Sequence, residues 1–263
     1  MHSVWGKDVR LHVYPWPKTK DEKMNSELRA AFAPTGTLRV AINLGNPILA
    51  GRSLDTGELH GVSVDLGEAL AAELEVPCLL IPYDAAGKAF AGLRDDAVDI
   101  AFFAHEPARA AEVALTNPYV LIEGCYLVRE GSPVLRNEDV DREGVRLAVG
   151  EGSAYDLFLS RTLKQATIER APTSPAVVEY FLDNNCDVAA GVRQQLEADA
   201  ARTTGLRILP ERFMTIRQAM AVMPSRGQDA IRFLEAFVEQ KKTSGFVLRS
   251  LHHNDVQGAS VPS

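Results

Sequence analysis

The chain has 263 residues, of which 46% are hydrophobic and 24% charged, an ordinary composition for a globular protein with one large or two small domains. Its 28 basic and 35 acidic residues give a net charge of −7, which excludes a protein that binds nucleic acid through a broadly basic face. No run of about 18 apolar residues occurs, so no membrane-spanning helix is predicted.

The first 23 residues are polar and aromatic and lack the apolar segment of a secretory signal, so we expect residues 1–23 to be an N-terminal extension. Met24 is then a candidate for the natural start. The three cysteines are far apart and form no recognisable disulfide pattern, which mildly favours a reducing compartment. Cys78 and Cys125 lie in apolar runs and are expected to be buried.

Strand-like and helix-like segments alternate through the first half of the chain. In one helical segment Val62, Leu66, Leu70 and Leu74 recur at every fourth position and form an apolar stripe. The order strand–helix–strand–helix–strand predicts parallel strands with right-handed crossovers. The strands are expected at residues 38–42, 77–81 (buried) and 98–103, and the helices at 61–74 and 85–93.

The alternation restarts after a long strand at 119–128 and a turn-forming cluster at 129–133. Two α/β units therefore lie in series, and their spacing allows either one doubly wound sheet or two lobes. The tail at 254–263 is polar and is expected to be flexible. The strands are expected at 145–149, 167–170, 187–190, 206–209 and 219–222, and the helices at 153–164, 174–182, 192–201, around the stripe Ala230, Phe233, Leu234, Phe237 and Val238, and at 247–251.

A single arginine, Arg109, follows the strand at 98–103 in a polar turn that also carries His105 and Glu106. Ligands of α/β folds bind at the carboxyl ends of strands. Arginine can hold a carboxylate through two parallel hydrogen bonds. Asn43 and Asn46 follow the first strand in the same way, although turn formation alone explains an Asn, Gly and Pro there.

A second candidate site is the turn at residues 150–154, between a strand and a helix. Its backbone N–H groups at Gly152, Ser153 and Ala154 could bind an anion at the helix N-terminus. The turn matches neither the dinucleotide fingerprint nor the P-loop. No cluster of His, Cys, Asp or Glu has the spacing of metal ligands, and no catalytic constellation stands out. We therefore expect no metal, no cofactor and no catalytic residues.

Six segments resemble, in chain order, the bacterial periplasmic solute-binding proteins of the amino-acid type, family 3, which have the type 2 periplasmic-binding fold. The resemblance covers residues 36–251. Each motif alone is weakly specific, but their order makes the set fairly specific. The segments are Gly36-Thr37-Leu38-Arg39-Val40-Ala41, Gly61-Val62-Ser63-Val64-Asp65-Leu66, Pro107-Ala108-Arg109, Asn117-Pro118-Tyr119, Val149-Gly150-Glu151-Gly152-Ser153 and Ser244-Gly245.

The resemblance implies an α/β fold of two Rossmann-like lobes joined by two hinge strands, near Val128 and Ala219. Lobe 1 would comprise residues 24–128 and 223–251, and lobe 2 residues 133–217. A ligand would bind between the lobes, which close on it by a hinge motion. Arg109 would hold a ligand carboxylate from lobe 1, and the N–H groups of Gly152, Ser153 and Ala154 would assist from lobe 2.

The chain also departs from the family pattern. Val192 stands where amino-acid binders usually place an Asp for the ligand's α-ammonium group, and a buried ammonium without a partner is costly. Either the ligand has no amino group at that point, or Glu106 or Glu123 replaces the Asp. Arg193 could instead meet a second anionic group. The turn between Asp99 and Arg109 is also shorter than usual.

The leading hypothesis is a monomeric, non-enzymatic protein that binds a small carboxylate-bearing solute, either amino-acid-like or an organic acid. It would serve the membrane component of an ABC-type importer or act alone as a sensor or carrier. The resemblance implies the periplasm, whereas the missing signal segment leaves the cytoplasm open. The alternatives are a lyase similar to cyclohexadienyl dehydratase, using Glu106, Glu123 or His105 in a closed cleft, and a regulatory effector domain.

Overall fold

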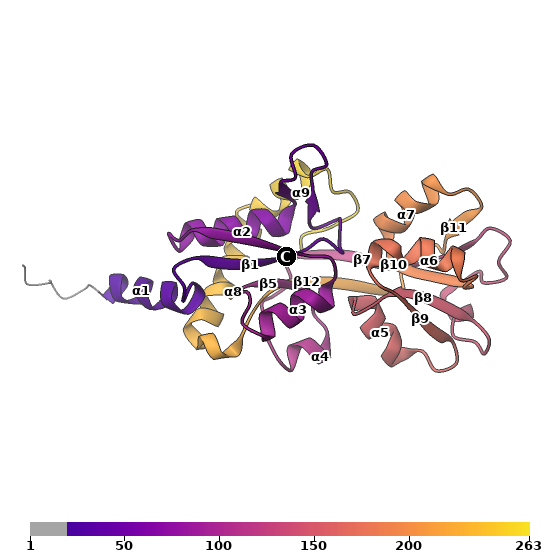
Figure 1. Cartoon of the computed structure of the whole chain (residues 1–263), viewed down its shortest axis with the longest axis horizontal. Helices are drawn as coiled ribbons and strands as arrows, with labels where there is room; N and C mark the ends of the chain where they lie inside the picture. The colour runs from indigo at the N-terminus through magenta and orange to yellow at the C-terminus, as the bar shows by residue number, and fades with distance from the viewer. Residues whose placement is uncertain (1–19) are drawn as a thin grey trace, which may run out of the picture.

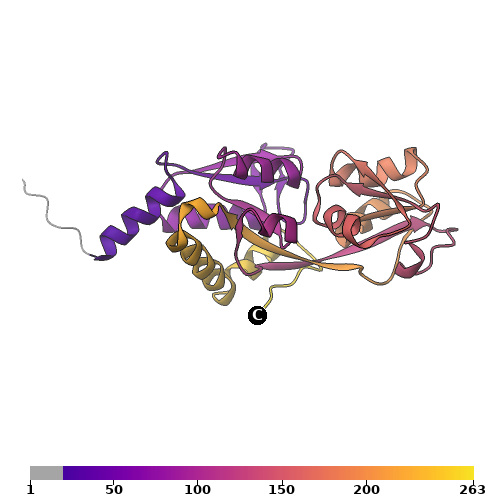
Figure 2. The ribbon, with the colours of Figure 1, turned by 90° about the horizontal axis from the view of Figure 1, so that it is seen from below.

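The computed structural model describes residues 20–263 and shows two lobes that lie side by side (Figure 1). Two long strands, β7 (Val120–Arg129) and β12 (Met214–Val222), run from one lobe to the other. A view from below shows both strands along the same side of the molecule (Figure 2). The mixed α/β architecture with two lobes confirms the predicted fold class. Of the two arrangements that the spacing allowed, the structure has two lobes and not one doubly wound sheet.

Lobe 1 is built on a parallel sheet. Strand β1 pairs with β4 in parallel, and a parallel bridge from Val40 to Ile100 joins β1 to the segment that leads into β5. This is the parallel arrangement that the alternating order predicts. The strands of lobe 1 are β1 (Leu38–Asn43), β2 (Gly51–Arg52), β3 (Leu59–His60), β4 (Cys78–Tyr83), β5 (Ala101–Ala104) and β6 (Ala114–Leu115).

The helices of lobe 1 bury the apolar stripes seen in the sequence. In the long helix α8 (Gln228–Thr243), Ala230, Leu234, Phe237 and Val238 are buried, while Phe233 is half-buried against Phe32. Burial of such side chains contributes about 1.5–3 kcal/mol each. The helices are α1 (Lys20–Phe32), α2 (Val62–Glu73), α3 (Ala86–Arg94), α4 (Pro107–Ala110), α8 (Gln228–Thr243) and α9 (Phe246–His253).

Lobe 2 repeats the α/β pattern with β8 at the centre of a parallel trio, flanked by β10 and β9. Its own apolar core contains Leu127, Phe181 and Leu196. Its strands are β8 (Arg146–Gly150), β9 (Thr167–Ala171), β10 (Val188–Val192) and β11 (Leu206–Ile208), and its helices are α5 (Ala154–Thr162), α6 (Val177–Asp183) and α7 (Arg193–Arg202). Three short 3₁₀ turns lie at Asn137–Asp139, Ser174–Ala176 and Pro224–Arg226.

The two long strands connect the sheets of both lobes. Residues 214–218 of β12 pair antiparallel with residues 120–124 of β7, and residues 218–221 of β12 pair with β5 in lobe 1. The second half of β7 pairs with β10 and β11 in lobe 2. The sequence placed the crossovers near Val128 and Ala219, which lie on these two strands; β7 and β12 pair with each other at residues 120–124 and 214–218, and Val128 pairs with Val188 of β10 in lobe 2. The lobe limits at 128, 133, 217 and 223 stay a prediction, since each long strand contributes to both lobes.

Strand β4 corrects one expectation of burial. The sequence predicts a buried strand there, but within the described residues β4 pairs only with β1 and forms an edge of the sheet. Leu79 is 50% exposed and Cys78 is half-buried, whereas Cys125 on the doubly paired β7 is fully buried, as expected. An apolar run does not tell an edge strand from a central one, because both can contain alternating or continuous hydrophobic residues.

The two ends of the chain also differ from expectation. The expected extension at 1–23 lies mostly outside the described residues, and α1 begins at Lys20. The C-terminal tail, expected to be flexible, is held against β7: the backbone groups of Leu121 and Ser260 exchange two hydrogen bonds of 2.8 and 3.0 Å. Gln194 of lobe 2 donates to the carbonyl of Gln257 at 2.8 Å. These backbone bonds do not depend on side-chain polarity, so composition does not reveal them.

Candidate functional site

Arg109 lies at the interface between the lobes. It comes from the short helix α4, directly after β5, and is only 4% exposed. Its Nη2 donates to the carbonyl oxygen of Gly152 in lobe 2 at 2.6 Å. On the other sides its guanidinium carbon is 5.1 Å from the ring centre of Phe103 and 5.8 Å from that of Phe90. The guanidinium therefore faces lobe 2 from an aromatic setting.

No carboxylate forms a hydrogen bond with Arg109 among the described residues, although it is almost fully buried. Burial lowers its pKa to about 10, and the nearby charge of Glu106 opposes this effect. The side chain is therefore still positively charged at neutral pH. A buried cation whose partners are one carbonyl and two ring faces can accommodate an anionic ligand.

A second contact between the lobes pairs Glu106 with Arg161. Glu106 precedes α4 and is 3% exposed, and Arg161 lies on α5 with 42% of its side chain exposed. Arg161 Nη1 and Glu106 Oε2 are 2.6 Å apart and form an ion pair. The two groups are not aligned for a hydrogen bond. Glu106 is thus at the interface, as the sequence suggested, but its charge is already paired.

The turn before α5 has a close fit to lobe 1. Gly152 has φ +65°, and a Cβ atom there would lie 3.3 Å from Cα of Gly87 at the start of α3. A larger residue would therefore be strained and would press the lobes apart. This explains why glycine stands between β8 and α5 at the point where the lobes meet.

The backbone donors of this turn are partly used within lobe 2. The N–H of Gly152 donates to Asp156 Oδ2 at 2.9 Å, and the N–H of Ser153 to the carbonyl of Gly150 at 3.1 Å. The Ser153 hydroxyl caps α5 by accepting from the N–H of Asp156 at 3.0 Å. Of the three expected donors, only the N–H of Ala154 has no partner in the described part of the chain. Their role toward a ligand stays a prediction.

A cavity of about 40 Å³ lies between the lobes, beside this turn. A smaller one of about 10 Å³ shares several of its walls. Two polar atoms at these cavities, Asn46 Oδ1 and the hydroxyl of Tyr155, are buried and have no hydrogen-bond partner within residues 20–263. The larger cavity is lined by Asn43, Gly45, Asn46 and Ala86 of lobe 1, by Ser153, Ala154, Tyr155, Ser174 and Val192 of lobe 2, and by Ile216 and Gln218 of β12.

Buried polar atoms without partners are uncommon in proteins, and they indicate places where a ligand or water completes the hydrogen bonding. Burial raises the pKa of the Tyr155 hydroxyl, and interactions with Ser174, Ser153 and the Gly150 backbone oppose this effect. The structure thus brings the expected Asn43, Asn46, Ser153 and Ala154 to one cavity. Arg109 reaches the carbonyl of Gly152, the residue before Ser153.

Glu123 and Arg193 do not line this cavity. Arg193 Nε donates to Glu123 Oε2 at 2.7 Å, and Arg212 Nη1 donates to Glu123 Oε1 at 2.9 Å. The hydrogen bond from Arg193 is the main cause that holds the pKa of Glu123 below its usual value. The three charges line an open surface hollow with Pro210 and Glu211. The structure therefore places both expected residues away from the interlobe cavity and paired with each other, and a role for them toward a ligand stays a prediction.

Several cavity residues were not expected from the sequence: Tyr155, Ser174, Ile216 and Gln218. Tyr155 stands two positions after Ser153 and so on the first turn of α5, a signal that could have been used. Gln218 precedes the expected strand at 219–222, and Ser174 begins an expected helix. Neither position has a local pattern that points to a ligand, because the cavity forms only when distant segments meet.

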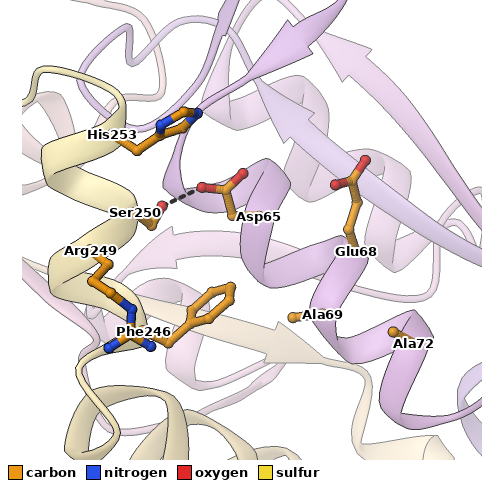
Figure 3. A pocket seen from close by; sticks show the side chains of 8 residues that line it. All are labelled: Asp65, Glu68, Ala69, Ala72, Phe246, Arg249, Ser250 and His253. Carbon is orange, nitrogen blue, oxygen red and sulfur yellow. Dashed lines mark hydrogen bonds between the residues drawn. The ribbon is translucent and has the colours of Figure 1, made fainter.

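A larger hollow of about 510 Å³ lies in lobe 1, and all its lining residues come from α2 and α9 (Figure 3). One of the lining residues, Asp65, accepts from the Ser250 hydroxyl at 2.5 Å and from Asn254 Nδ2 at 3.3 Å. Asp65, which belongs to the motif at residues 61–66, therefore joins α2 to α9. The hollow is an open surface groove on one lobe, and it is separate from the interlobe contacts of Arg109 and Glu106.

No group of three or more His, Cys, Asp or Glu side chains in residues 20–263 is arranged to hold a metal ion. Within the same residues, none of the helices combines the length and apolar character needed to cross a membrane.

One curated relative with similar sequence is an L-arginine-binding protein of Pseudomonas aeruginosa. The two are 28% identical over 173 residues, which is 64% of this chain and 63% of the relative's length.

Solved structures with the same fold include a mutant of ArgBP from T. maritima, at a TM-score of 0.74 and 18% identity over 89% of this chain and all of that chain (100%). An ancestral amino acid-binding protein, described as a precursor of cyclohexadienyl dehydratase, has a TM-score of 0.70 and 18% identity over 84% of this chain and 95% of that one. At such identities these structures establish the fold.

The family model of the bacterial extracellular solute-binding proteins, family 3, matches residues 38–249, which is most of the chain and includes both lobes. It covers the cavity residues, the turn at Gly152 and Arg109. The motifs that the sequence shares with this family and the two-lobed fold agree with the match. The chain belongs to the bacterial extracellular solute-binding proteins of family 3.

Proposed function

We propose that this protein binds a small carboxylate-bearing solute between its lobes, and that Arg109 holds the carboxylate. The observation that carries the proposal is the buried guanidinium of Arg109 at the lobe interface, with a carbonyl in place of an anionic partner. A carboxylate would replace that carbonyl and form two charge-assisted hydrogen bonds. The named ligands of the relative and of the similar structures, which are amino acids, support this class of solute.

The solute enters when the lobes separate, because the contacts of Arg109 with Gly152 and of Glu106 with Arg161 close the interface. The paired segments of β7 and β12 act as the hinge, since they are the long strands that lead from lobe 1 to lobe 2. In this proposal the protein delivers its solute to the membrane component of an ABC-type importer, or acts alone as a sensor or carrier.

A lyase on the same scaffold is the second candidate, and the similarity to a precursor of cyclohexadienyl dehydratase favours considering it. The three side chains considered for acid–base chemistry are all engaged. Glu106 pairs with Arg161, Glu123 pairs with Arg193 and Arg212, and His105 Nε2 lies 2.7 Å from the carbonyl of Thr116. A general base must be free to reach the substrate, so these contacts support binding over turnover.

The proposal is tested by isothermal titration calorimetry with a panel of amino acids and organic acids. For any acid that binds, Arg109→Ala should weaken binding about 100-fold, because two charge-assisted bonds worth roughly 3 kcal/mol together are lost. Arg94→Ala, an exposed arginine of α3, is the matched control and should leave the affinity unchanged. If Arg109→Ala binds every such acid as tightly as the wild type, the carboxylate clamp is wrong.

A further inference from the structure

Three acidic side chains at and beside the interlobe cavities, Glu106, Asp156 and Asp199, are paired with arginines. Glu106 contacts Arg161 at the interface, and Asp156, under the turn at Gly152, contacts Arg170 at 3.0 Å. Asp199, the carboxylate that lines the smaller cavity, is bound by Arg202 and accepts from Gln195 at 3.1 Å. A cationic group of a ligand would therefore have to displace an arginine to reach any of these three carboxylates.

The walls of the larger cavity carry no charge. Their polar side chains are amides and hydroxyls, from Asn43, Asn46, Ser153, Tyr155, Ser174 and Gln218. Val192 lines both cavities from lobe 2 and is apolar. An ammonium group enclosed by these walls would lose its hydration without gaining an ion pair, which costs several kcal/mol.

The same walls do offer hydrogen bonds to an uncharged group. Asn46 Oδ1 and the Tyr155 hydroxyl are both buried and have no hydrogen bond of good geometry among the described residues, although Ser153 and Ser174 lie near the Tyr155 hydroxyl. A ligand hydroxyl donates and accepts at once, so it could meet the amide of Asn46 in either orientation and also the phenol of Tyr155. The cavity thus matches a hydroxyl group, and Arg109 matches a carboxylate.

We propose that the solute is a small hydroxycarboxylic acid without an ammonium group. This inference rests on the proposed function, because it assumes that the ligand lies between the lobes with its carboxylate at Arg109. A ligand without an ammonium group also needs no carboxylate at the position of Val192. Neither Glu106 nor Glu123 replaces the missing acid, because each is neutralised by arginine.

Calorimetry with matched pairs of acids tests the proposal on the full chain. The pairs are glycolate and glycine, lactate and alanine, and 2-hydroxyglutarate and glutamate, with arginine and lysine added as the ligands expected of a binder of basic amino acids. We expect at least one hydroxy acid to bind about tenfold or more tightly than its amino partner. Equal affinities, or tighter binding of any amino acid, would overturn the inference and leave the proposed function standing.

A substitution at the cavity wall provides an independent readout. Val192→Asp adds a carboxylate of similar size and should shift the preference of the pair by about tenfold or more toward the amino acid. Val192→Asn is the matched neutral control and should keep the preference for the hydroxy acid. If neither kind of acid binds to the wild type, or if Arg109→Ala leaves all binding unchanged, the proposed function itself fails and the inference fails with it.

Discussion

Two places in lobe 1 bury a charged group that lies close to arginine or is arginine, and they differ in how that charge is paired. Near the start of the sheet, the fully buried carboxylate of Asp99 receives two hydrogen bonds from Arg39, at 2.7 and 3.0 Å, and one from Arg226, at 2.9 Å. Its two oxygens are therefore saturated by cations. At the other end of the same segment, Arg109 is as deeply buried but has no carboxylate hydrogen bond with any described residue.

The comparison separates a structural ion cluster from a candidate ligand site. A complete cluster can hold a fold together, because each buried charge has a partner. An incomplete one is costly to the fold, and proteins retain strained or unsatisfied groups mainly where they bind or react. Each place buries one charged group, the carboxylate of Asp99 or the guanidinium of Arg109, but only the carboxylate of Asp99 has hydrogen bonds from groups of opposite charge.

The largest effect is expected on removing Asp99. Asp99→Ala leaves Arg39 and Arg226 close together without their shared carboxylate, and breaking a buried pair in this way typically costs about 3 kcal/mol or more. The free energy of unfolding, measured by urea denaturation, should fall by that amount. Asp96→Ala is the control, since Asp96 contacts the same two arginines but is exposed. It should cost less than about 1 kcal/mol, and equal losses from both variants would contradict a special role for Asp99.

Arg109 should behave in the opposite way in the same unfolding experiment. Arg109→Met keeps most of the apolar volume beside Phe90 and Phe103 and removes a buried cation that has no anionic partner. The free energy of unfolding should stay within about 1 kcal/mol of the wild type or rise, while binding of a carboxylate ligand is lost. A loss of stability as large as that of Asp99→Ala would show that Arg109 is a structural residue.

The sequence predicted the local elements that position the candidate site. The apolar stripe predicted α8, and the glycine-rich turn with Ser153 predicted a strand that ends just before a capped helix. The position of Arg109 after a strand predicted its place at the carboxyl end of the sheet. These predictions succeed because periodicity and capping are local properties of the chain.

The pairing of the charges could not be predicted in the same way. Glu106 and Arg161 are far apart in the sequence, and so are Glu123 and Arg193, so no spacing indicates that they meet. The first half of β12 was also missed, because Thr215 and Arg217 interrupt the apolar residues with exposed side chains. Which acid is neutralised decides what the cavity can bind, and this depends on the tertiary structure alone.

A smaller effect is expected at the contact between the lobes. Arg161 is 42% exposed, so its ion pair with Glu106 is weakened by solvent and should contribute about 1 kcal/mol or less to the closed form. Arg161→Gln should therefore shift the unliganded protein toward open forms, seen as a larger radius of gyration in small-angle X-ray scattering. Lys88→Gln breaks an ion pair between Lys88 of α3 and Asp84, just before that helix, and should not change the radius. An unchanged radius in Arg161→Gln would mean that other contacts hold the lobes together.

The smallest effect concerns the charge network that lies away from the cavity. The pKa of Glu123 is lowered in the folded protein, chiefly by the hydrogen bond from Arg193. A carboxyl with a lowered folded pKa stabilises the protein above its unfolded value, about 4.3 for glutamate, and this contribution is lost as the pH falls through the folded pKa. Glu123→Gln should therefore be less stable than the wild type at pH 7 by under about 1 kcal/mol.

The difference between Glu123→Gln and the wild type should begin to shrink as the pH falls below about 4.3 and should close only below the lowered folded pKa, where the wild-type carboxyl is also neutral. Arg193→Gln should reproduce most of this change, and Arg212→Gln less, since the hydrogen bond from Arg193 is the larger cause. The measurement is urea denaturation between pH 7 and about pH 3. A gap that stays constant over this range would show that packing of the side chain matters, and not its charge. Glu123 would then differ from Asp99, whose effect requires its charged partners.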